Sequence, residues 1–158
     1  MGAPQGAFFI GRRFDFKHID IVREYSAGIE QIHGASSELQ QVFLNLLINA
    51  AHAMGDKIYD VHPPRITLRT FVQDGFAVAE VEDNGPGIPE EKHARIFDPF
   101  FTTKEPGRGT GLGLSVSYFI ITRNHGGTIS VRSKPGQSTC FTVRLPLRSG
   151  TKSQTPRQ

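Results

Sequence analysis

The spacing of hydrophobic residues along the chain predicts three helices. Between positions 36 and 55 the apolar residues recur with helical spacing, at Leu39, Val42, Phe43, Leu46, Ala50, Ala53 and Met54. Ser36 or Ser37 can cap the start of this helix, and Gly55 can end it. Similar patterns predict a short helix over residues 89–96 and a second long helix over residues 112–124.

Runs rich in β-forming residues fill most of the remaining chain. They are predicted to pair as three hairpins: residues 19–25 with 29–33 around Ser26-Ala27-Gly28, residues 65–72 with 76–82, and residues 128–133 with 139–145. Because helices separate the strand pairs, the pattern favours an α/β two-layer sandwich, an α+β fold. Its mixed β-sheet would carry helices packed on one face, unlike a parallel doubly wound sheet.

Length and composition point to a single folded domain. The chain has 158 residues, 37% hydrophobic and 21% charged, which excludes a wholly disordered chain and a membrane-spanning protein. We expect a lead segment over residues 1–18, the domain over residues 19–147, and a disordered basic tail over residues 148–158. The net charge of +3 comes without a long basic run, so no nucleic-acid footprint is predicted. The single cysteine, Cys140, excludes a disulfide framework.

One stripe of the first long helix carries polar side chains of an unusual kind. Two amides, Asn45 and Asn49, lie four residues apart and therefore on neighbouring turns. One interpretation is a polar stripe whose amides bond nearby backbone. The other is a cation site, since amide oxygens suit Mg²⁺ when a triphosphate supplies its other ligands.

Two glycine-bearing loops are candidates for ligand contact. In residues 83–88, Asp83 ends a strand, where its carboxylate could accept a hydrogen bond from an exocyclic amine; an ordinary Asx turn is the alternative. In residues 105–114, alternating glycines directly precede a helix, an arrangement that binds phosphate; a flexible linker is the alternative. No Gly-Lys pair exists for a Walker loop, and the glycine offsets do not fit a dinucleotide fingerprint.

A phenylalanine-rich segment lies between these loops. Phe97, Phe100 and Phe101 could dock a mobile lid, and Lys104 could reach a phosphate. For Phe97 and Phe100 we favour the alternative that they are ordinary core residues.

The order of these segments resembles the ATP-binding catalytic domain of sensor histidine kinases, a member of the GHKL ATPase superfamily. Across residues 19–146 the matching segments are residues 41–50 (N box), 83–88 (first glycine box), 97–104 (F box), 107–114 (second glycine box) and 138–146 (last strand). The wording of the N box is most similar to nitrogen-regulation-type kinases. The resemblance implies a Bergerat-type ATP-binding fold with ATP and Mg²⁺ as cofactors.

The resemblance also implies a role for each matched residue. Asn49 would coordinate Mg²⁺ with support from Asn45, and Asp83 would bond the adenine amino group. Gly85 and Gly87 would let backbone approach the adenine, with Ile88 on its face and Thr139 at the same end. Asn49 and Lys104 are the predicted catalytic residues. The β- and γ-phosphates would be held by Lys104 and by the backbone of Gly109, Thr110, Gly111, Leu112, Gly113 and Leu114. The reaction would be in-line transfer of the γ-phosphoryl group to histidine.

No phosphoacceptor histidine is found in the sequence. None of the six histidines is followed by an acidic residue, as the family's phosphoacceptor normally is. We therefore expect a monomeric catalytic fragment that binds ATP without phosphorylating itself. Its partner would be the phosphoacceptor and dimerisation domain of the same kinase and, indirectly, a response regulator, with no nucleic acid and no direct membrane contact. The domain would be cytoplasmic, whether or not the parent kinase is anchored in a membrane.

Some features depart from the family pattern and leave alternatives open. His52 and Ala53 stand where the family often has Lys or Arg followed by Tyr. His52 could replace a phosphate ligand, although we favour a solvated side chain. Residues 98–109 are expected to be mobile without nucleotide. The rival functions are a degenerate nucleotide-binding regulatory module, an anti-sigma-type serine kinase and, less favoured, a gyrase-type ATPase domain.

Overall fold

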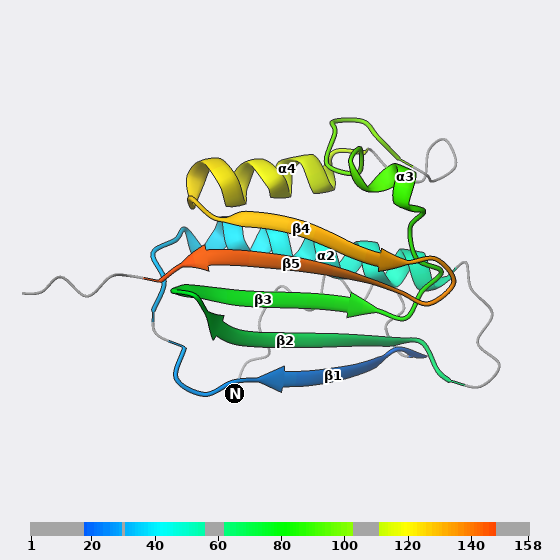
Figure 1. The fold of residues 1–158 in the computed structure, drawn as a ribbon, viewed down its shortest axis with the longest axis horizontal. Helices are drawn as coiled ribbons and strands as arrows, with labels where there is room; N and C mark the ends of the chain where they lie inside the picture. Colours follow the sequence, from blue (N-terminus) through cyan, green and yellow to red (C-terminus); the bar gives the residue numbers. More distant parts are fainter. Residues whose placement is uncertain (1–17, 30, 56–61, 103–110, 148–158) are drawn as a thin grey trace, which may run out of the picture.

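The described part of the chain forms a five-stranded mixed sheet. The computed structural model describes residues 18–29, 31–55, 62–102 and 111–147. In sequence order the strands are β1 (Asp20–Tyr25), β2 (Arg65–Gln73), β3 (Phe76–Asp83), β4 (Thr128–Lys134) and β5 (Ser138–Pro146). Their spatial order is β1-β2-β3-β5-β4, with β1 parallel to β2 and all other pairs antiparallel (Figure 1). The predicted mixed sheet is confirmed.

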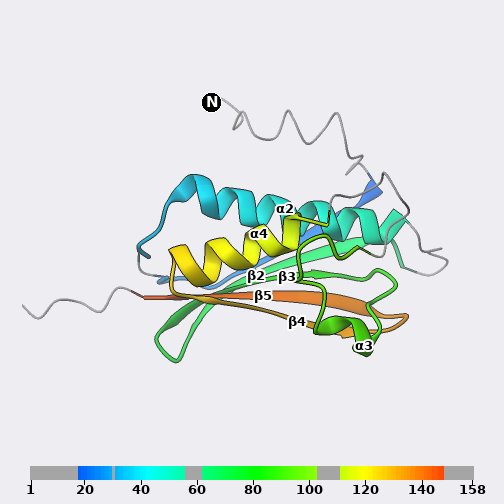
Figure 2. The same cartoon turned by 90° about the horizontal axis from the view of Figure 1, so that it is seen from above.

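The helices form the second layer. They are α2 (Ser36–Gly55), α3 (Glu90–His93), α4 (Gly113–Phe119) and η2 (Ile120–Asn124). The backbone stays in the right-handed helical region from Phe119 to Ile120, so α4 and η2 form one continuous helical run. Figure 2 shows α2 and α4 side by side on one face of the sheet, with α3 beyond the end of α4. The predicted two-layer arrangement is therefore confirmed.

The core lies between α2 and the inner face of the sheet. The buried residues of α2 are spaced four apart, at Val42, Leu46, Ala50 and Met54. They join one cluster with sheet residues that include Ile66, Val81, Phe141 and Val143. Full burial of a side chain such as Leu46 contributes about 2 kcal/mol. Packing of this stripe thus decides which face of α2 remains for polar side chains.

The first predicted hairpin is wrong. β1 does not fold back on residues 29–33 but pairs in parallel with β2, from Asp20 opposite Arg65 to Tyr25 opposite Thr70. The chain leaves β1 after Tyr25, and Ile32 makes only an isolated antiparallel bridge to Leu147. Apolar and polar residues alternate only weakly over residues 29–33. The edge of β2, by contrast, pairs with the whole length of β1, although the two strands are distant in sequence.

The other two hairpins and the three helices lie where they were predicted. In the β2–β3 turn, Asp74 and Gly75 both have positive φ, at 52° and 78°. Two-residue turns of this kind match the twist of an antiparallel pair. None of the helices within the described ranges combines the length and hydropathy that a bilayer crossing requires.

A buried histidine joins the start of α2 to the end of η2. The Ala35 backbone N–H donates to His125 Nε2 at 3.0 Å, and His125 Nδ1 lies 2.9 Å from the Ile120 carbonyl oxygen. Because Nε2 accepts this bond, Nδ1 carries the ring N–H and donates it to the Ile120 carbonyl oxygen. Nearby, Asn124 Nδ2 donates to Glu38 Oε1 at 2.9 Å. With the contact between Asn45 and Gly113, these bonds make α2 and α4 antiparallel, and the start of α4 faces the middle of α2.

Candidate functional site

The polar stripe of α2 meets the first turn of α4. Asn45 Nδ2 donates to the Gly113 carbonyl oxygen at 3.2 Å and to Ser117 Oγ at 3.3 Å. Ser117 Oγ in turn donates to the same Gly113 carbonyl oxygen at 2.8 Å. The Asn45 amide therefore does bond nearby backbone, and in doing so it attaches α2 to the helix that follows the second glycine box.

The same stripe reaches the first glycine box two turns later. A Cβ added to Gly85 would lie 3.5 Å from Ala53. Since Asn45, Asn49 and Ala53 are spaced four apart, Asn49 lies between the Gly113 turn and the Gly85 turn. Asn49 is half-buried, and within the described ranges no hydrogen bond of its side chain is found. His52 is also half-buried, so it is not a fully solvated side chain.

Asp83 ends β3 with its carboxylate buried. Only 3% of the residue is exposed, and Oδ1 accepts a hydrogen bond from the Gly85 N–H at 2.9 Å. That bond is the Asx turn expected as the alternative interpretation. The carboxylate is buried as well as bonded in this turn, unlike that of an exposed Asx turn.

The first glycine box is docked on the β4–β5 turn. Gly87 has φ +74°, and an added Cβ would lie 2.4 Å from the Lys134 carbonyl oxygen. The Gly136 N–H donates to the Pro86 carbonyl oxygen at 2.6 Å, and the Ile88 N–H donates to Ser133 Oγ at 2.8 Å. Close backbone packing against the turn thus requires glycine at position 87.

Thr139 lies beside the Asp83 loop. It is paired with Asp83 in the β3–β5 register and is 4% exposed. Its Oγ1 lies 2.8 Å from Ser133 Oγ. Because Ser133 donates its own proton to the Ser138 carbonyl oxygen, Thr139 is the donor in that pair. The strand register pairs Asp83 with Thr139, and the bond from Ile88 to Ser133 brings Ile88 to the same end of the sheet.

The phenylalanine-rich segment is only partly core. Phe97 packs on Tyr118 and Phe141, with ring centroids 5.6 and 6.3 Å apart, so the core prediction is confirmed for this residue. For Phe100 it is wrong: the residue is 73% exposed with φ 65°. Its backbone is instead bonded to Gly111, whose carbonyl oxygen accepts from the Phe100 N–H at 2.9 Å.

The second glycine box is described only at its end. Lys104, Gly109 and Thr110, with most of the predicted lid over residues 98–109, lie outside the described residues. Gly111 has φ +68°, Leu112 precedes α4 and is 36% exposed, and Leu114 packs against the core. Gly113 and Leu114 begin the α4 run, where backbone N–H groups have no helical acceptor.

Strong charge interactions lie away from this region, on the sheet face opposite the helices. Arg69 Nε lies 2.7 Å from Glu24 Oε2, and its guanidinium also pairs with Glu80 and Glu82. Hydrogen bonds to Glu82, the largest cause, and to Glu24 raise the pKa of Arg69. Burial raises the pKa of the Cys140 thiol to about 11. Both residues alternate with inward-facing neighbours along their strands, so neither points toward the α2 stripe.

Cavity shape alone does not identify the site. A largely apolar hollow of about 400 Å³ between α2 and strands β1 to β3 is lined by residues that include Phe43, Leu47 and Leu68. A second hollow of about 500 Å³ beside α3 and β4 is lined by residues that include His93, Arg132 and Lys134. Neither is lined by the α2 amides or Asp83.

Comparison with known proteins agrees with this arrangement. Residues 34–149 match the family described as "Histidine kinase-, DNA gyrase B-, and HSP90-like ATPase". The chain belongs to this ATPase family. The predicted membership of the GHKL group is confirmed, and with it the expectation that the domain uses ATP.

Similar curated proteins are sensor kinases. The chain is 42% identical over 117 residues to the two-component sensor PprA of Pseudomonas aeruginosa, covering 73% of this chain and 12% of that protein. It is 39% identical over 130 residues to the signal transduction histidine-protein kinase AtoS of Escherichia coli, covering 82% and 20%. It is 38% identical over 143 residues to the sensory histidine kinase/phosphatase NtrB of Rhodobacter capsulatus, covering 82% and 38%. The chain thus spans 12% to 38% of the length of these relatives.

Solved structures agree on the fold. The catalytic domain of histidine kinase ThkA has a TM-score of 0.71 at 29% identity, covering 88% of this chain and 87% of that one. Full-length ShkA in complex with AMPPNP has a TM-score of 0.72 at 28% identity, covering 90% and 28%. The predicted histidine kinase catalytic-domain fold is confirmed.

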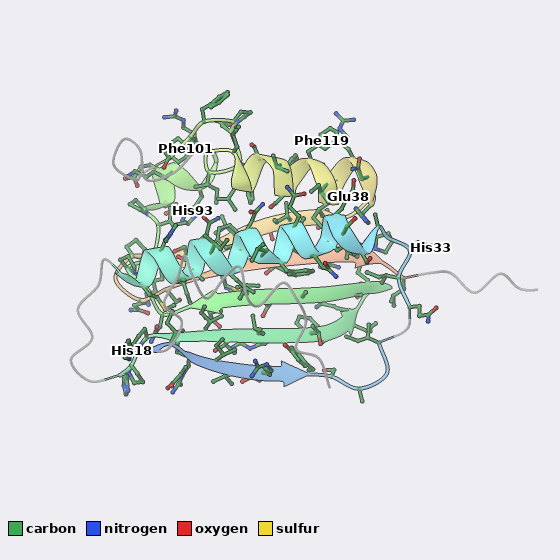
Figure 3. The ribbon with its side chains drawn as sticks, turned by 180° about the vertical axis from the view of Figure 1, so that it is seen from behind. His18, His33, Glu38, His93, Phe101 and Phe119 are labelled. Carbon is green, nitrogen blue, oxygen red and sulfur yellow. The ribbon has the colours of Figure 1, made fainter. Side chains whose placement is uncertain are left out.

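Three polar residues of this region were missed from the sequence. Ser117, Ser133 and His125 each form hydrogen bonds between elements far apart in the chain. A serine within the apolar pattern of the second long helix was the one available signal for Ser117. Figure 3 shows α2 crossing the sheet with α4 beside it, the arrangement in which α2 and α4 contact each other.

Proposed function

We propose that this chain is the ATP- and Mg²⁺-binding catalytic domain of a two-component sensor histidine kinase. It would transfer the γ-phosphoryl group of ATP to a histidine on a separate phosphoacceptor and dimerisation domain. One observation carries the proposal: the amide stripe of α2 runs from the first turn of α4 to the buried Asp83 loop. The helix α2 thereby connects the start of α4, which would bind phosphate, with the Asp83 carboxylate, which would bind the amino group of the base.

The base of ATP would bind at the Asp83 end. The Asp83 carboxylate is positioned by the Gly85 N–H, and so can accept from the adenine amino group without leaving its place. Gly85 has no side chain to separate the backbone from a planar ring, and an added Cβ would meet Asp83 Oδ1 at 2.6 Å. Ile88 would contact the ring face, and Thr139 would line the same end.

The phosphates would bind at the start of α4, with Mg²⁺ beside Asn49. The residues fit the ion, because Asn49 offers a neutral amide oxygen that no described residue engages. No cluster of three His, Cys, Asp or Glu side chains suited to a metal occurs in the described ranges, so the other ligands would be phosphate oxygens and water. The ion would neutralise phosphate charge. The backbone of residues 111–114 would donate N–H groups, while Lys104, Gly109 and Thr110 keep the roles expected from the resemblance.

The domain's contribution to the reaction would be positioning and charge neutralisation. The acceptor histidine would come from the partner domain of the same kinase, which would pass the phosphoryl group to a response regulator. Isolated, the domain would be a monomer that binds nucleotide without labelling itself. We place it in the cytoplasm, without direct membrane contact. ShkA is structurally similar and has been solved with AMPPNP, which supports nucleotide use here.

Isothermal titration of a non-hydrolysable ATP analogue with Mg²⁺ tests the binding site. Asp83→Asn removes the charge that accepts from adenine, and Asn49→Asp alters the proposed magnesium ligand. Each should weaken binding by about tenfold or more, the effect of one hydrogen bond to a charged group. Asp74→Asn in the exposed β2–β3 turn and Gln41→Glu on α2 are matched controls that should bind like wild type. Unchanged affinity in both test variants would contradict the assignment.

Phosphoryl transfer needs a second experiment. The domain would be mixed with labelled ATP and the histidine-bearing dimerisation domain of a relative such as NtrB. Acid-labile label on that domain supports a histidine kinase, whereas acid-stable label supports a serine kinase. Nucleotide binding without transfer to several such domains would favour the regulatory module.

A further inference from the structure

Ser117 places a hydroxyl in the interface between α2 and α4, opposite the Asn45 amide. It is fully buried on the α2-facing side of α4, where alanine would fill the space with a better helix former. Its proton is committed to the Gly113 carbonyl oxygen at 2.8 Å, so toward Asn45 the hydroxyl can only accept.

The hydrogen bond from Ser117 to the Gly113 carbonyl oxygen orients the Asn45 amide. Asn45 meets two oxygen acceptors on α4, the Gly113 carbonyl at 3.2 Å and Ser117 Oγ at 3.3 Å. Only the NH₂ group can bond both, so Oδ1 must point away from them. With the amide reversed, Oδ1 would face two acceptor oxygens and the Asn45 NH₂ group would lose both partners.

We infer that Ser117 is a positioning residue for the magnesium and phosphate end of the site, an assignment that rests on the proposed function. Through Asn45 it holds the first turn of α4 at a fixed place along α2. Asn49 lies one turn farther along α2, so the same contact sets the spacing between its amide oxygen and the N–H groups of α4. Ser117 itself touches neither nucleotide nor metal.

The test compares Ser117→Ala with a control that loses the same kind of bond elsewhere. Thr122 Oγ1 donates to the Tyr118 carbonyl oxygen at 2.7 Å, also four residues back on this helical run. Thr122→Ala therefore removes an equivalent bond near the other end of the run. Binding of a non-hydrolysable ATP analogue would be measured by calorimetry over a Mg²⁺ titration, and binding of adenosine by NMR titration.

Ser117→Ala should weaken analogue binding about five- to tenfold and raise the Mg²⁺ concentration needed, while adenosine binding changes less than twofold. Thr122→Ala should leave both ligands unaffected. Equal losses for analogue and adenosine would overturn the inference, since they indicate a general packing role, and so would unchanged analogue binding. If Ser117→Ala does not fold, Ser117→Cys, whose side chain is slightly larger and whose thiol is a weaker hydrogen-bond donor, is judged by the same two ligands. Wild-type protein that fails to bind the analogue would instead reject the proposed function.

Discussion

The two ends of the candidate site are built by different kinds of contact. At the Asp83 end, the loop after β3 is held by the β3–β5 register and by backbone docking on the β4–β5 turn, and Asp83 and Thr139 are 3% and 4% exposed. At the α4 end, one amide and one hydroxyl join two helices, beside the exposed Phe100. The first end can move only if sheet hydrogen bonds break, whereas the second can shift at the cost of a few side-chain bonds. We therefore expect rearrangement on nucleotide binding to occur mainly at the α4 end.

The largest effect is expected from Gly87→Ala at the rigid end. The new methyl group would meet the Lys134 carbonyl oxygen at 2.4 Å, and φ is +74°. Neither partner can yield without undocking the loop from the turn. The variant should lose about 3 kcal/mol of unfolding free energy, the sum of left-handed strain and overpacking, and should lose adenosine binding as well. Urea unfolding and NMR titration measure the two effects.

Gly136→Ala is the matched control for this variant. Gly136 lies in the β4–β5 turn with φ +77°, but nothing lies within 4 Å of an added Cβ. It should therefore show left-handed strain alone, about 1 kcal/mol. Equal destabilisation by the two variants would mean that close docking does not hold this end.

Gly111→Ala applies a similar clash to the other end of the site. An added Cβ would lie 2.5 Å from the Phe100 carbonyl carbon, with φ +68°. Because Phe100 is largely exposed, its segment can move aside, and we expect a loss of only about 1–2 kcal/mol in stability. Binding of the triphosphate analogue should weaken several-fold, with adenosine binding unchanged. A stability loss as large as that of Gly87→Ala would show that the two ends are equally rigid.

Features that depend on residues close in sequence could be predicted, whereas features that depend on residues far apart in sequence could not. The β2–β3 and β4–β5 hairpins and the end of α2 at Gly55 depend on neighbouring residues, and all were predicted. The pairing of β1 with β2 joins residues 45 positions apart, as Asp20 with Arg65, and local alternation indicated a hairpin instead. The motifs of the site and their order along the chain could also be recognised, because each box is a continuous run of residues.

The missed features depend on how separate elements meet. Phe100 is hydrophobic, yet it is exposed, with its backbone at positive φ and bonded to Gly111, a residue outside its own segment. The link from Ser117 to Asn45 depends on the rotation of two helices against each other, which hydrophobic spacing predicts only to within a residue or two. Such contacts are where the three-dimensional structure adds to the motifs.

The smallest effect concerns Cys140, which follows Thr139 at the rigid end but points to the opposite face of the sheet. Burial, with the charges of Glu80 and Glu82, raises the pKa of its thiol from 9.0 to about 11. The folded state therefore disfavours the thiolate. The resulting stability is fully present below pH 9, the unfolded value, and is lost as the pH rises toward 11. The unfolding free energy of wild type should fall relative to Cys140→Ala across this interval, as measured by urea unfolding at each pH.

Since the Cys140 thiol faces away from Thr139, analogue binding should not change between pH 8 and about 9.5, where the folded thiol is still protonated. Loss of binding there in wild type but not in Cys140→Ala would mean that the two sheet faces at this end are coupled, contrary to the rigidity inferred from its register.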